Sequence, residues 1–283
     1  MLDLVSGFVL AVVQGVTAWI PVSSKTQVIL VGNAIFSLPF KEALAFALVL
    51  HLGDFVAAVY RYREEYLNAL LALRNPAGLL DFSSRDYLDK EHSFLFVSIA
   101  ATVVVALPLY LLAGSFFAGL RGEWLLAAAG LLLITMAIIT WASREGASQE
   151  QAEAFEGITL KSSLLTGMAQ GLSVLPGISR SGITQAALLG QGFKADEAVR
   201  LSFLMAAPMI LAAFAAFAFI EGFPGIPLEV AVLGIIVSAG VSLATMEGVT
   251  RVAEKLPAHY FSAAVGLLAL VPLVLLLTAG VAE

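Results

Sequence analysis

The sequence contains no cysteine, only three histidines and few charged residues, which make up 13% of its 283 positions. Without cysteine the chain forms no disulfide and performs no thiol chemistry. The formal net charge of −6 argues against the basic surface that nucleic-acid binding needs, so we expect no nucleic-acid partner. Hydrophobic residues account for 60% of the chain, and the mean hydropathy is +0.94. This composition is typical of a polytopic membrane protein.

One polar turn interrupts the apolar sequence at residues 176–184, which read PGISRSGIT. A charge at membrane depth is expensive, so Arg180 is a functional-site hypothesis by default. Small residues allow the backbone to open, and its N–H groups, the hydroxyls and the guanidinium then favour an anion such as phosphate. The structural alternative is an arginine at the membrane interface whose side chain reaches water.

A second version of this turn occurs at residues 21–26, which read PVSSKT. Aligning the prolines matches Ser24 with Ser179 and Lys25 with Arg180. The match continues upstream between residues 14–17 and 170–173, and downstream between residues 42–43 and 197–198. An ordered set of matches at nearly constant spacing indicates a tandem duplication.

The apolar segments predict an all-α polytopic membrane protein with an inverted-topology repeat, six transmembrane helices and two re-entrant helical hairpins. Segments too short to span the bilayer flank each polar turn, which indicates a re-entrant hairpin. We expect a first repeat over residues 1–142 (hairpin 4–38; spans 42–60, 93–113 and 123–142), a linker over 143–160 and a second repeat over 161–283 (hairpin 161–192; spans 197–221, 228–250 and 257–280).

Three spans per half is an odd number, so the second half should enter the membrane upside down relative to the first. The basic residues support this topology, because one predicted side has only Lys41 and Arg121, whereas the other collects Arg61, Arg63, Arg74, Arg85, Lys90, Arg144, Lys161, Lys194, Arg251 and Lys255. By the positive-inside rule the richer side is cytoplasmic and both termini lie outside a plasma membrane. The hairpins then enter from opposite sides, which brings Lys25 and Arg180 within reach of one central site.

These motifs resemble the undecaprenyl-diphosphate phosphatase family, the type also linked to bacitracin resistance. The resemblance covers nearly the whole chain and is most specific over residues 14–24 (QGVTAWIPVSS), 176–184 and 197–208. It implies hydrolysis of a C55-type polyprenyl diphosphate to the monophosphate and phosphate, with a divalent metal (Mg²⁺ or Ca²⁺), for recycling of the lipid carrier in cell-envelope synthesis. It also implies a site open to the outer face, and a homodimer is one assembly to test.

The chain departs from the family pattern in its first motif. Gln14 fits the first position, but the second carboxylate of the motif falls on Ala18. A histidine usually found beyond the serine pair falls on Gln27, Lys25 stands where a small or hydroxyl residue is usual, and an arginine common in the last span is replaced near residues 260–262. Loss of a carboxylate removes a metal ligand or a general base, which typically contributes ~100- to 10,000-fold to a rate. Either the lineage works without that glutamate, or it has lost hydrolysis, or the sequence carries an introduced Glu→Ala change.

The resemblance and the residues together assign catalysis to Ser24, Arg180, Gln14 and position 18, now Ala18. Gln14 is also the candidate metal ligand. Substrate binding is assigned to the hydroxyl, amide and basic residues of the two turns, namely Ser23, Lys25, Thr26, Gln27, Ser179, Arg180, Ser181 and Thr184.

Each assignment has a structural alternative. Ser24 is a nucleophile or a phosphate donor, or else a hydroxyl that caps an opened helix end. Lys25 binds phosphate or reaches the outer interface, and Gln14 orients water or joins two helices by a hydrogen bond. His51 and Asp54 share a helix face and could handle protons, bind a metal or form a structural hydrogen-bonded pair.

Glu42 and Glu197 stand at symmetric helix starts, where a carboxylate is simply favourable. At the level of function, the alternative to hydrolysis is a polyprenyl-phosphate transporter or flippase, which would explain the missing glutamate. A non-catalytic lipid-binding scaffold would leave the paired serine–basic motifs unexplained.

Overall fold

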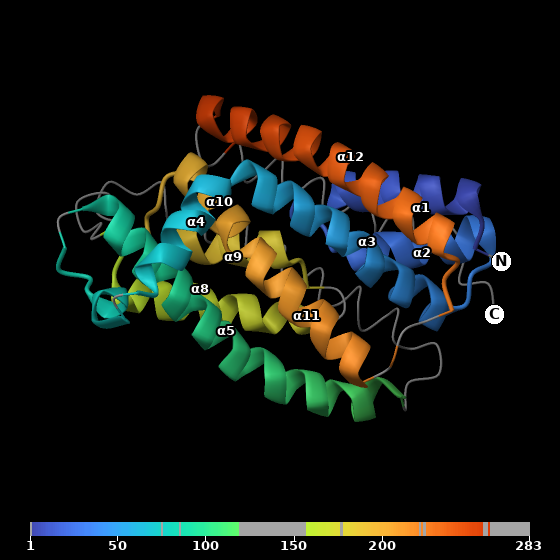
Figure 1. The fold of residues 1–283 in the computed structure, drawn as a ribbon, viewed down its shortest axis with the longest axis horizontal. Coiled ribbons are helices and arrows are strands. Elements are labelled where there is room, and N and C mark those ends of the chain that lie inside the picture. The colour runs from blue at the N-terminus through green and yellow to red at the C-terminus, as the bar shows by residue number, and fades with distance from the viewer. Residues whose placement is uncertain are drawn as a thin grey trace.

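The computed structural model describes residues 2–74, 76–84, 86–118, 157–175, 178–220, 222, 225–256 and 260, and all the regular secondary structure in this part of the chain is helical. No strand occurs within these ranges, so the all-α prediction is confirmed. The long helices run at modest angles to the long axis of the molecule (Figure 1). In chain order the elements are α1 (Leu4–Thr17), α2 (Ser24–Phe36), α3 (Phe40–Arg61), α4 (Arg63–Ala72), η1 (Pro76–Leu80), α5 (Tyr87–Ala118), α8 (Leu160–Gly171), η2 (Leu172–Val174), α9 (Arg180–Leu189), α10 (Ala195–Leu204), α11 (Ala206–Ile220) and α12 (Leu228–Lys255).

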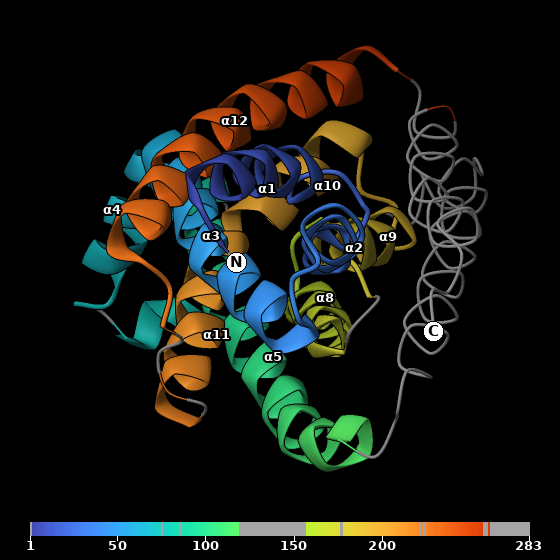
Figure 2. The same cartoon turned by 90° about the vertical axis from the view of Figure 1, so that its right-hand side faces the viewer.

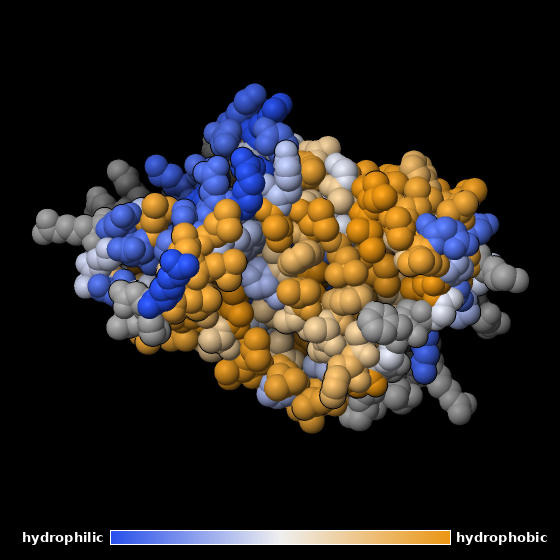
Figure 3. Space-filling view, viewed as in Figure 1, coloured by the Kyte–Doolittle hydropathy of each residue, from blue (hydrophilic) through white to orange (hydrophobic). Residues whose placement is uncertain are grey.

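Four helical stretches are long and apolar enough to cross a membrane: Phe40–Arg61, Tyr87–Leu112, Ala195–Ile220 and Leu228–Lys255. Apolar side chains form a broad band across the middle of the molecule, and polar side chains gather at its two ends (Figure 3). The chain is therefore a polytopic membrane protein. The expected spans 123–142 and 257–280, and the linker up to residue 156, lie outside the described residues.

The first expected hairpin, residues 4–38, consists of α1 and α2. The side chain of Asp3 accepts a hydrogen bond from the backbone N–H of Ser6 at 2.8 Å, and the Ser6 hydroxyl bonds back to Asp3, which starts α1 with a capping box. The helix ends at Thr17, four residues before Pro21. After the polar turn α2 runs to Phe36, where Ser37 takes a left-handed conformation and turns the chain into α3.

The second expected hairpin, residues 161–192, consists of α8, the short η2 and α9. α8, like α1, starts with a capping box, which Thr159 and Ser162 form. The helix ends at Gly171, and the chain re-enters a helix at Arg180. Figure 1 places α1 and α2 toward the end where the N-terminus lies, and α8 and α9 toward the opposite end.

The first helix of each hairpin packs against a long span from the other half of the chain. Gly15 of α1 lies against α12, where an added Cβ would come within 2.7 Å of Val241 and 2.9 Å of the Ser238 carbonyl oxygen. Gly171 of α8 lies against α5 in the same manner. An added Cβ there would come within 2.6 Å of Val105 and 3.1 Å of the Thr102 carbonyl oxygen. Small residues permit such close helix contacts in membranes. Figure 2 shows both pairs, α1 beside α12 and α8 beside α5.

The expected span 197–221 is interrupted at Met205, between α10 and α11. Pro208 has no N–H group with which to bond the carbonyl four residues earlier, which belongs to Leu204. The hydroxyl of Tyr66, on α4, donates a hydrogen bond to that carbonyl oxygen at 2.7 Å. Burial raises the pKa of Tyr66, so the hydroxyl keeps the proton that it donates. The interruption is therefore stabilised by a side chain from the surface segment between α3 and α5.

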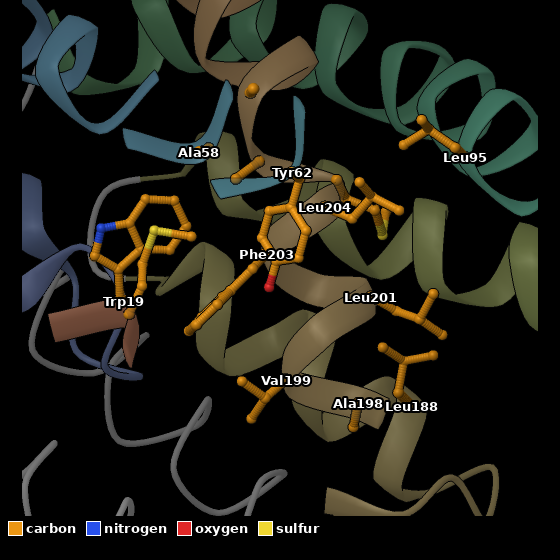
Figure 4. Packing of buried hydrophobic residues seen from close by; sticks show 14 of the residues in the cluster. Trp19, Ala58, Tyr62, Leu95, Leu188, Ala198, Val199, Leu201, Phe203 and Leu204 are labelled. Atoms are coloured by element: carbon orange, nitrogen blue, oxygen red, sulfur yellow. The ribbon is translucent and has the colours of Figure 1, made fainter. Parts of the chain in front are cut away.

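The core near this interruption is aromatic and aliphatic. Trp19, in the first polar turn, is fully buried and makes an edge-to-face contact with Phe203 of α10, with ring centroids 4.9 Å apart. Figure 4 shows Tyr62, Leu201 and Leu204 in the same cluster. The first turn is thus anchored to an element of the second half. This contact fixes the position of the residues that follow Trp19 in the chain.

Candidate active site

The two polar turns touch each other inside the molecule. The hydroxyl of Ser181 donates a hydrogen bond to the Ile20 carbonyl oxygen at 2.9 Å. The hydroxyl of Ser179 donates one to the Val22 carbonyl oxygen at 3.3 Å. Lys25 reaches the opposite way, with its Nζ 3.4 Å from the Ser173 carbonyl oxygen. Residues that lie about 155 positions apart in the sequence therefore share one place in the fold.

Two helices begin at this junction, and their amino ends differ. Ser179 caps α9, because its hydroxyl oxygen accepts a hydrogen bond from the Gly182 N–H at 3.2 Å. Ser23 stands at the equivalent position before α2, but its side chain makes no capping bond and accepts one from the Thr26 hydroxyl at 3.0 Å instead. The first N–H groups of a helix have no partner within the helix, and they attract anions. The side chain of Ser23 therefore leaves the first backbone N–H groups of α2 available to a ligand.

Two cations flank these helix starts, and neither forms an ion pair within the described residues. Arg180 donates weakly to two carbonyl oxygens, those of Ser202 at 3.4 Å and Ala18 at 3.5 Å, and its guanidinium lies 5.2 Å from the ring of Trp19. Lys25 has only its contact with Ser173. Partly buried positive charges that form no salt bridge, next to helix amino ends, form an electropositive centre suited to a phosphate group.

A polar network lies next to this centre and is built around Gln14, one turn before the end of α1. The amide nitrogen Nε2 of Gln14 lies 2.6 Å from Oδ2 of Asp54 on α3 and 3.3 Å from the Ser24 hydroxyl oxygen. Ser242 of α12 donates to the other oxygen of Asp54, Oδ1, at 2.6 Å. The network therefore links α1, α2, α3 and α12, and both Asp54 and Gln14 are fully buried.

The orientation of the Gln14 amide follows from these contacts. An amide oxygen at 2.6 Å from a carboxylate would be repelled, so the nitrogen faces Asp54. Nδ1 of His51 lies 2.6 Å from the Ala47 carbonyl oxygen, so it carries a proton and donates to that oxygen. The second N–H of Gln14 is thus directed to Ser24 or to Nε2 of His51, at 3.3 and 3.4 Å. The amide oxygen of Gln14 is buried and accepts no hydrogen bond in the described structure.

Other unpaired polar atoms lie on the same turn. The indole N–H of Trp19 and the amide nitrogen of Gln27 are both buried without an acceptor within the described residues. Buried donors of this kind are rare in folded proteins and call for an explanation. Two unpaired donors near the first turn and two cations at the junction of the turns indicate a site for an acceptor-rich ligand.

A model of the family described as "Bacitracin resistance protein BacA" matches residues 7–271. The chain is 34% identical over 277 residues to an undecaprenyl-diphosphatase of Methanococcoides burtonii, covering 97% of this chain and all of the relative. It is also 34% identical to an undecaprenyl-diphosphatase of Haloarcula marismortui (88% of this chain and 89% of the relative) and 33% identical to one of Pyrobaculum islandicum (95% and 96%).

The chain belongs to the BacA family. The matched range includes both polar turns and every described residue of the Gln14 network. In this BacA-family chain, the departures from the family pattern at residues 18, 25 and 27 lie at the end of α1 and the start of α2. Ala18 is buried at the end of α1, and its carbonyl oxygen faces Arg180. Gln27 lies in the first turn of α2, and Lys25 is the cation of that turn.

The divalent metal expected from the family resemblance finds an incomplete set of ligands among the described residues. No three side chains of the His, Cys, Asp or Glu type come together there. Mg²⁺ and Ca²⁺ bind oxygen atoms, whereas Gln14 presents its nitrogen to Asp54, and both oxygens of Asp54 already accept hydrogen bonds. The residues thus form a hydrogen-bonded network rather than a metal cage. The divalent metal stays a prediction.

The remaining predicted residues of this BacA-family site form bonds within the protein. The hydroxyl of Thr184 lies 2.5 Å from that of Ser202, which joins α9 to α10. Thr26 is bonded to Ser23. Glu197 accepts a hydrogen bond from Tyr87 at 2.8 Å, close to the ion pair between Arg200 and Glu91 and outside the junction of the turns.

Sequence reasoning missed Ser242, Ser202 and the indole of Trp19. Ser238 and Ser242 lie one turn apart in an otherwise apolar span, which is a signal for a polar helix face. The sequence offers no signal that this face meets Asp54. Nor does it indicate that Ser202 pairs with Thr184, since these contacts join separate helices.

Proposed function

We propose that this chain is an integral membrane phosphatase that hydrolyses a polyprenyl diphosphate, of the undecaprenyl type, to the monophosphate and phosphate. Its relatives carry the name undecaprenyl-diphosphatase. The observation that carries the proposal is the junction of the two turns, where Lys25 and Arg180 flank two helix starts and form no salt bridge with a described acidic residue. A diphosphate supplies the negative charge and the acceptor oxygens that this junction lacks.

Arg180 would hold two oxygens of the diphosphate with its guanidinium, and Lys25 would add a second positive charge. The open N–H groups at the start of α2 and the unpaired donors of Trp19 and Gln27 would take further phosphate oxygens. Transfer of a phosphoryl group depends mainly on positioning and on stabilising negative charge, which these residues can provide.

We place the attack at Ser24. Its hydroxyl oxygen, or a water molecule held beside it, forms a bond to the terminal phosphorus, and the anhydride P–O bond breaks, so that the polyprenyl monophosphate leaves. If Ser24 is phosphorylated, water then attacks the phosphorus, the bond to the Ser24 oxygen breaks, and phosphate is released. In either route one water is consumed, and its protons end on the released phosphate and in solvent.

A phosphate-release assay tests the proposal directly. The unaltered chain and Ala18→Glu, purified in detergent, are incubated with polyprenyl diphosphate, and rapid acid quenching followed by mass spectrometry detects phosphorylated Ser24. Release of phosphate by the unaltered chain supports the proposal, and release by Ala18→Glu alone would indicate an inactivated enzyme. If neither chain releases phosphate but liposomes containing either one move the lipid between leaflets, the protein is a transporter and the proposal fails.

We also propose that both termini lie outside the plasma membrane and that the site opens to the outer face. The end of the molecule that carries α4 also carries the start of α8 and the end of α12 (Figure 1). These segments contribute Arg63, Lys161, Arg251 and Lys255, and positive charge favours the cytoplasmic side. The chain has no cysteine, so single cysteines at Asp3 and Glu254 can be labelled with an impermeant reagent. Labelling of the Glu254 position in intact cells would contradict this orientation, and chemical crosslinking of the same variants tests the homodimer.

A further inference from the structure

Asp54 is a buried carboxylate that the family motif does not predict. It lies in the middle of α3, is fully buried, and forms no ion pair with a described basic residue. A buried carboxylate is costly unless hydrogen bonds or a nearby positive charge compensate it. Asp54 obtains two short hydrogen bonds, from Gln14 and Ser242, both at 2.6 Å. Its position therefore needs an explanation beyond packing.

The carboxylate lies close to the position where the motif has lost one. Gln14 and Ala18 are four residues apart at the end of α1, with the Ala18 N–H bonded to the Gln14 carbonyl oxygen at 2.9 Å, so their side chains lie on one helix face. Asp54 bonds the side chain of Gln14. Ala18 packs in the same buried cluster as Ala57 and Ala58, which lie one turn beyond Asp54 on α3. The carboxylate of Asp54 is thus bonded to the residue that stands one helical turn before position 18.

We infer that Asp54 supplies from α3 the negative charge that the motif would supply at position 18, and that it acts as a positioning residue by holding Gln14 against Ser24. This inference rests on the proposed phosphatase function. Asp54 fixes the nitrogen of Gln14, which leaves the other N–H to face Ser24 or His51 and leaves the amide oxygen free. A free amide oxygen can accept a hydrogen bond from the attacking water or hydroxyl, as glutamines do in nucleotide hydrolases.

The network also fixes Asp54 itself. Ser242 holds Oδ1 of Asp54, and Ser238, one turn earlier on α12, donates to the Leu50 carbonyl oxygen on α3 at 2.9 Å. Gly53 allows this close approach, because a Cβ there would lie 1.8 Å from the hydroxyl oxygen of Ser238 and 2.5 Å from the Ile235 carbonyl oxygen. Two serines and one glycine thus set the register of α3 against α12, and this register places the carboxylate under Gln14.

The test is a double-mutant cycle between positions 54 and 18. Phosphate release from polyprenyl diphosphate is measured for the unaltered chain, Asp54→Asn, Ala18→Glu and the double variant, with kcat and KM determined separately. Asn has the shape of Asp, so Asp54→Asn preserves packing, and unfolding in detergent is followed to verify this. We expect Asp54→Asn to lower kcat by about 100-fold, the size of a lost orienting group, with little change in KM. The double variant should recover about tenfold or more, whereas Ala18→Glu alone should gain little, because the charge is already present.

Three outcomes would overturn the inference. One is an Asp54→Asn variant that keeps the kcat of the unaltered chain, and another is an Ala18→Glu change that raises kcat equally in both backgrounds. The third is an unaltered chain that is inactive while Ala18→Glu is active, since Asp54 would then not replace the motif residue. If none of the four chains releases phosphate, the proposed function itself fails. Gln170→Leu serves as the matched control, because Gln170 is the buried glutamine at the equivalent place in the second half.

Discussion

Gln14 and Gln170 stand at equivalent places in the last turns of α1 and α8, and both are buried. Gln14 contacts Ser24 and the Asp54 carboxylate, whereas Gln170 donates to the hydroxyl of Thr102 at 3.1 Å. Thr102 itself donates to the Gly167 and Ser98 carbonyl oxygens, so Gln170 belongs to a group of contacts that joins α8 to α5. The amide oxygen of Gln170, like that of Gln14, is buried without a hydrogen-bond partner among the described residues. Within the part of the chain that the structure describes, the two glutamines differ in that Gln14 alone is bonded to a carboxylate.

The largest effect should come from the cation that the second half contributes. We expect Arg180→Ala to lower the rate of phosphate release by about 1,000-fold, as for other arginines that stabilise a transferring phosphoryl group. Arg251→Ala is the control, since Arg251 forms an exposed pair with Glu247, and such pairs contribute less than ~1 kcal/mol. Normal affinity of Arg180→Ala for the lipid diphosphate would show that the second turn does not bind substrate.

The next effect compares the two glutamines directly. Gln14→Leu should lower kcat by about 100-fold because it removes the group that orients the attacking oxygen. Gln170→Leu removes one hydrogen bond, to Thr102, and should leave kcat unchanged. Steady-state kinetics on both purified variants checks this difference. Equal losses in the two variants would mean that both glutamines act only through packing.

A smaller effect is expected from Lys25, the cation of the first half. Lys25→Met should raise KM by about tenfold, which corresponds to the loss of one charge-assisted hydrogen bond of ~1.4 kcal/mol. Lys161→Met, at the exposed start of α8, is the matched control and should keep the KM of the unaltered chain. An unchanged KM for Lys25→Met would favour the alternative in which this side chain only reaches the membrane interface.

The smallest effect concerns stability and should be the same in both halves. Gly15→Ala and Gly171→Ala each force a methyl group against a facing backbone carbonyl and a valine, and overpacking of this kind costs about 1–3 kcal/mol. Gly248→Ala on α12 meets no atom within 4 Å and should stabilise the helix slightly. Unfolding midpoints in detergent measure all three variants. A loss in only one of the first two would show that the halves are not packed equivalently.

The sequence predicts much of the fold because the breaks are marked by local chemistry. Pro21 and the adjacent Ser23 and Ser24 predict the first turn. The repeated pattern at Ser179 and Arg180 predicts that the two turns meet at one site. The contacts between Ser181 and Ile20, and between Ser179 and Val22, agree with that grouping. Their inverted orientation and the boundaries of the two repeats stay predictions.

The Gln14 network could not be derived from the sequence alone. Asp54 and Ser242 are distant in the chain and meet only because α3 packs against α12, which local patterns do not specify. The interruption at Met205 had a local signal in Pro208, but the apolar run 197–221 outweighed it. The partner that stabilises the interruption, Tyr66, lies in a surface segment whose position depends on tertiary contacts.

The crossed packing of the hairpins has a consequence for biosynthesis. α1 packs closely against α12, which leaves the ribosome long after α1, whereas α8 follows its partner α5 in the chain and can meet it as soon as it is made. The opened end of α1, with its polar side chains, must therefore wait in the translocon or among lipids until most of the chain is made. Truncation before α12 should leave the side of α1 around Gly15 uncovered and make the nascent protein a substrate for membrane quality-control proteases.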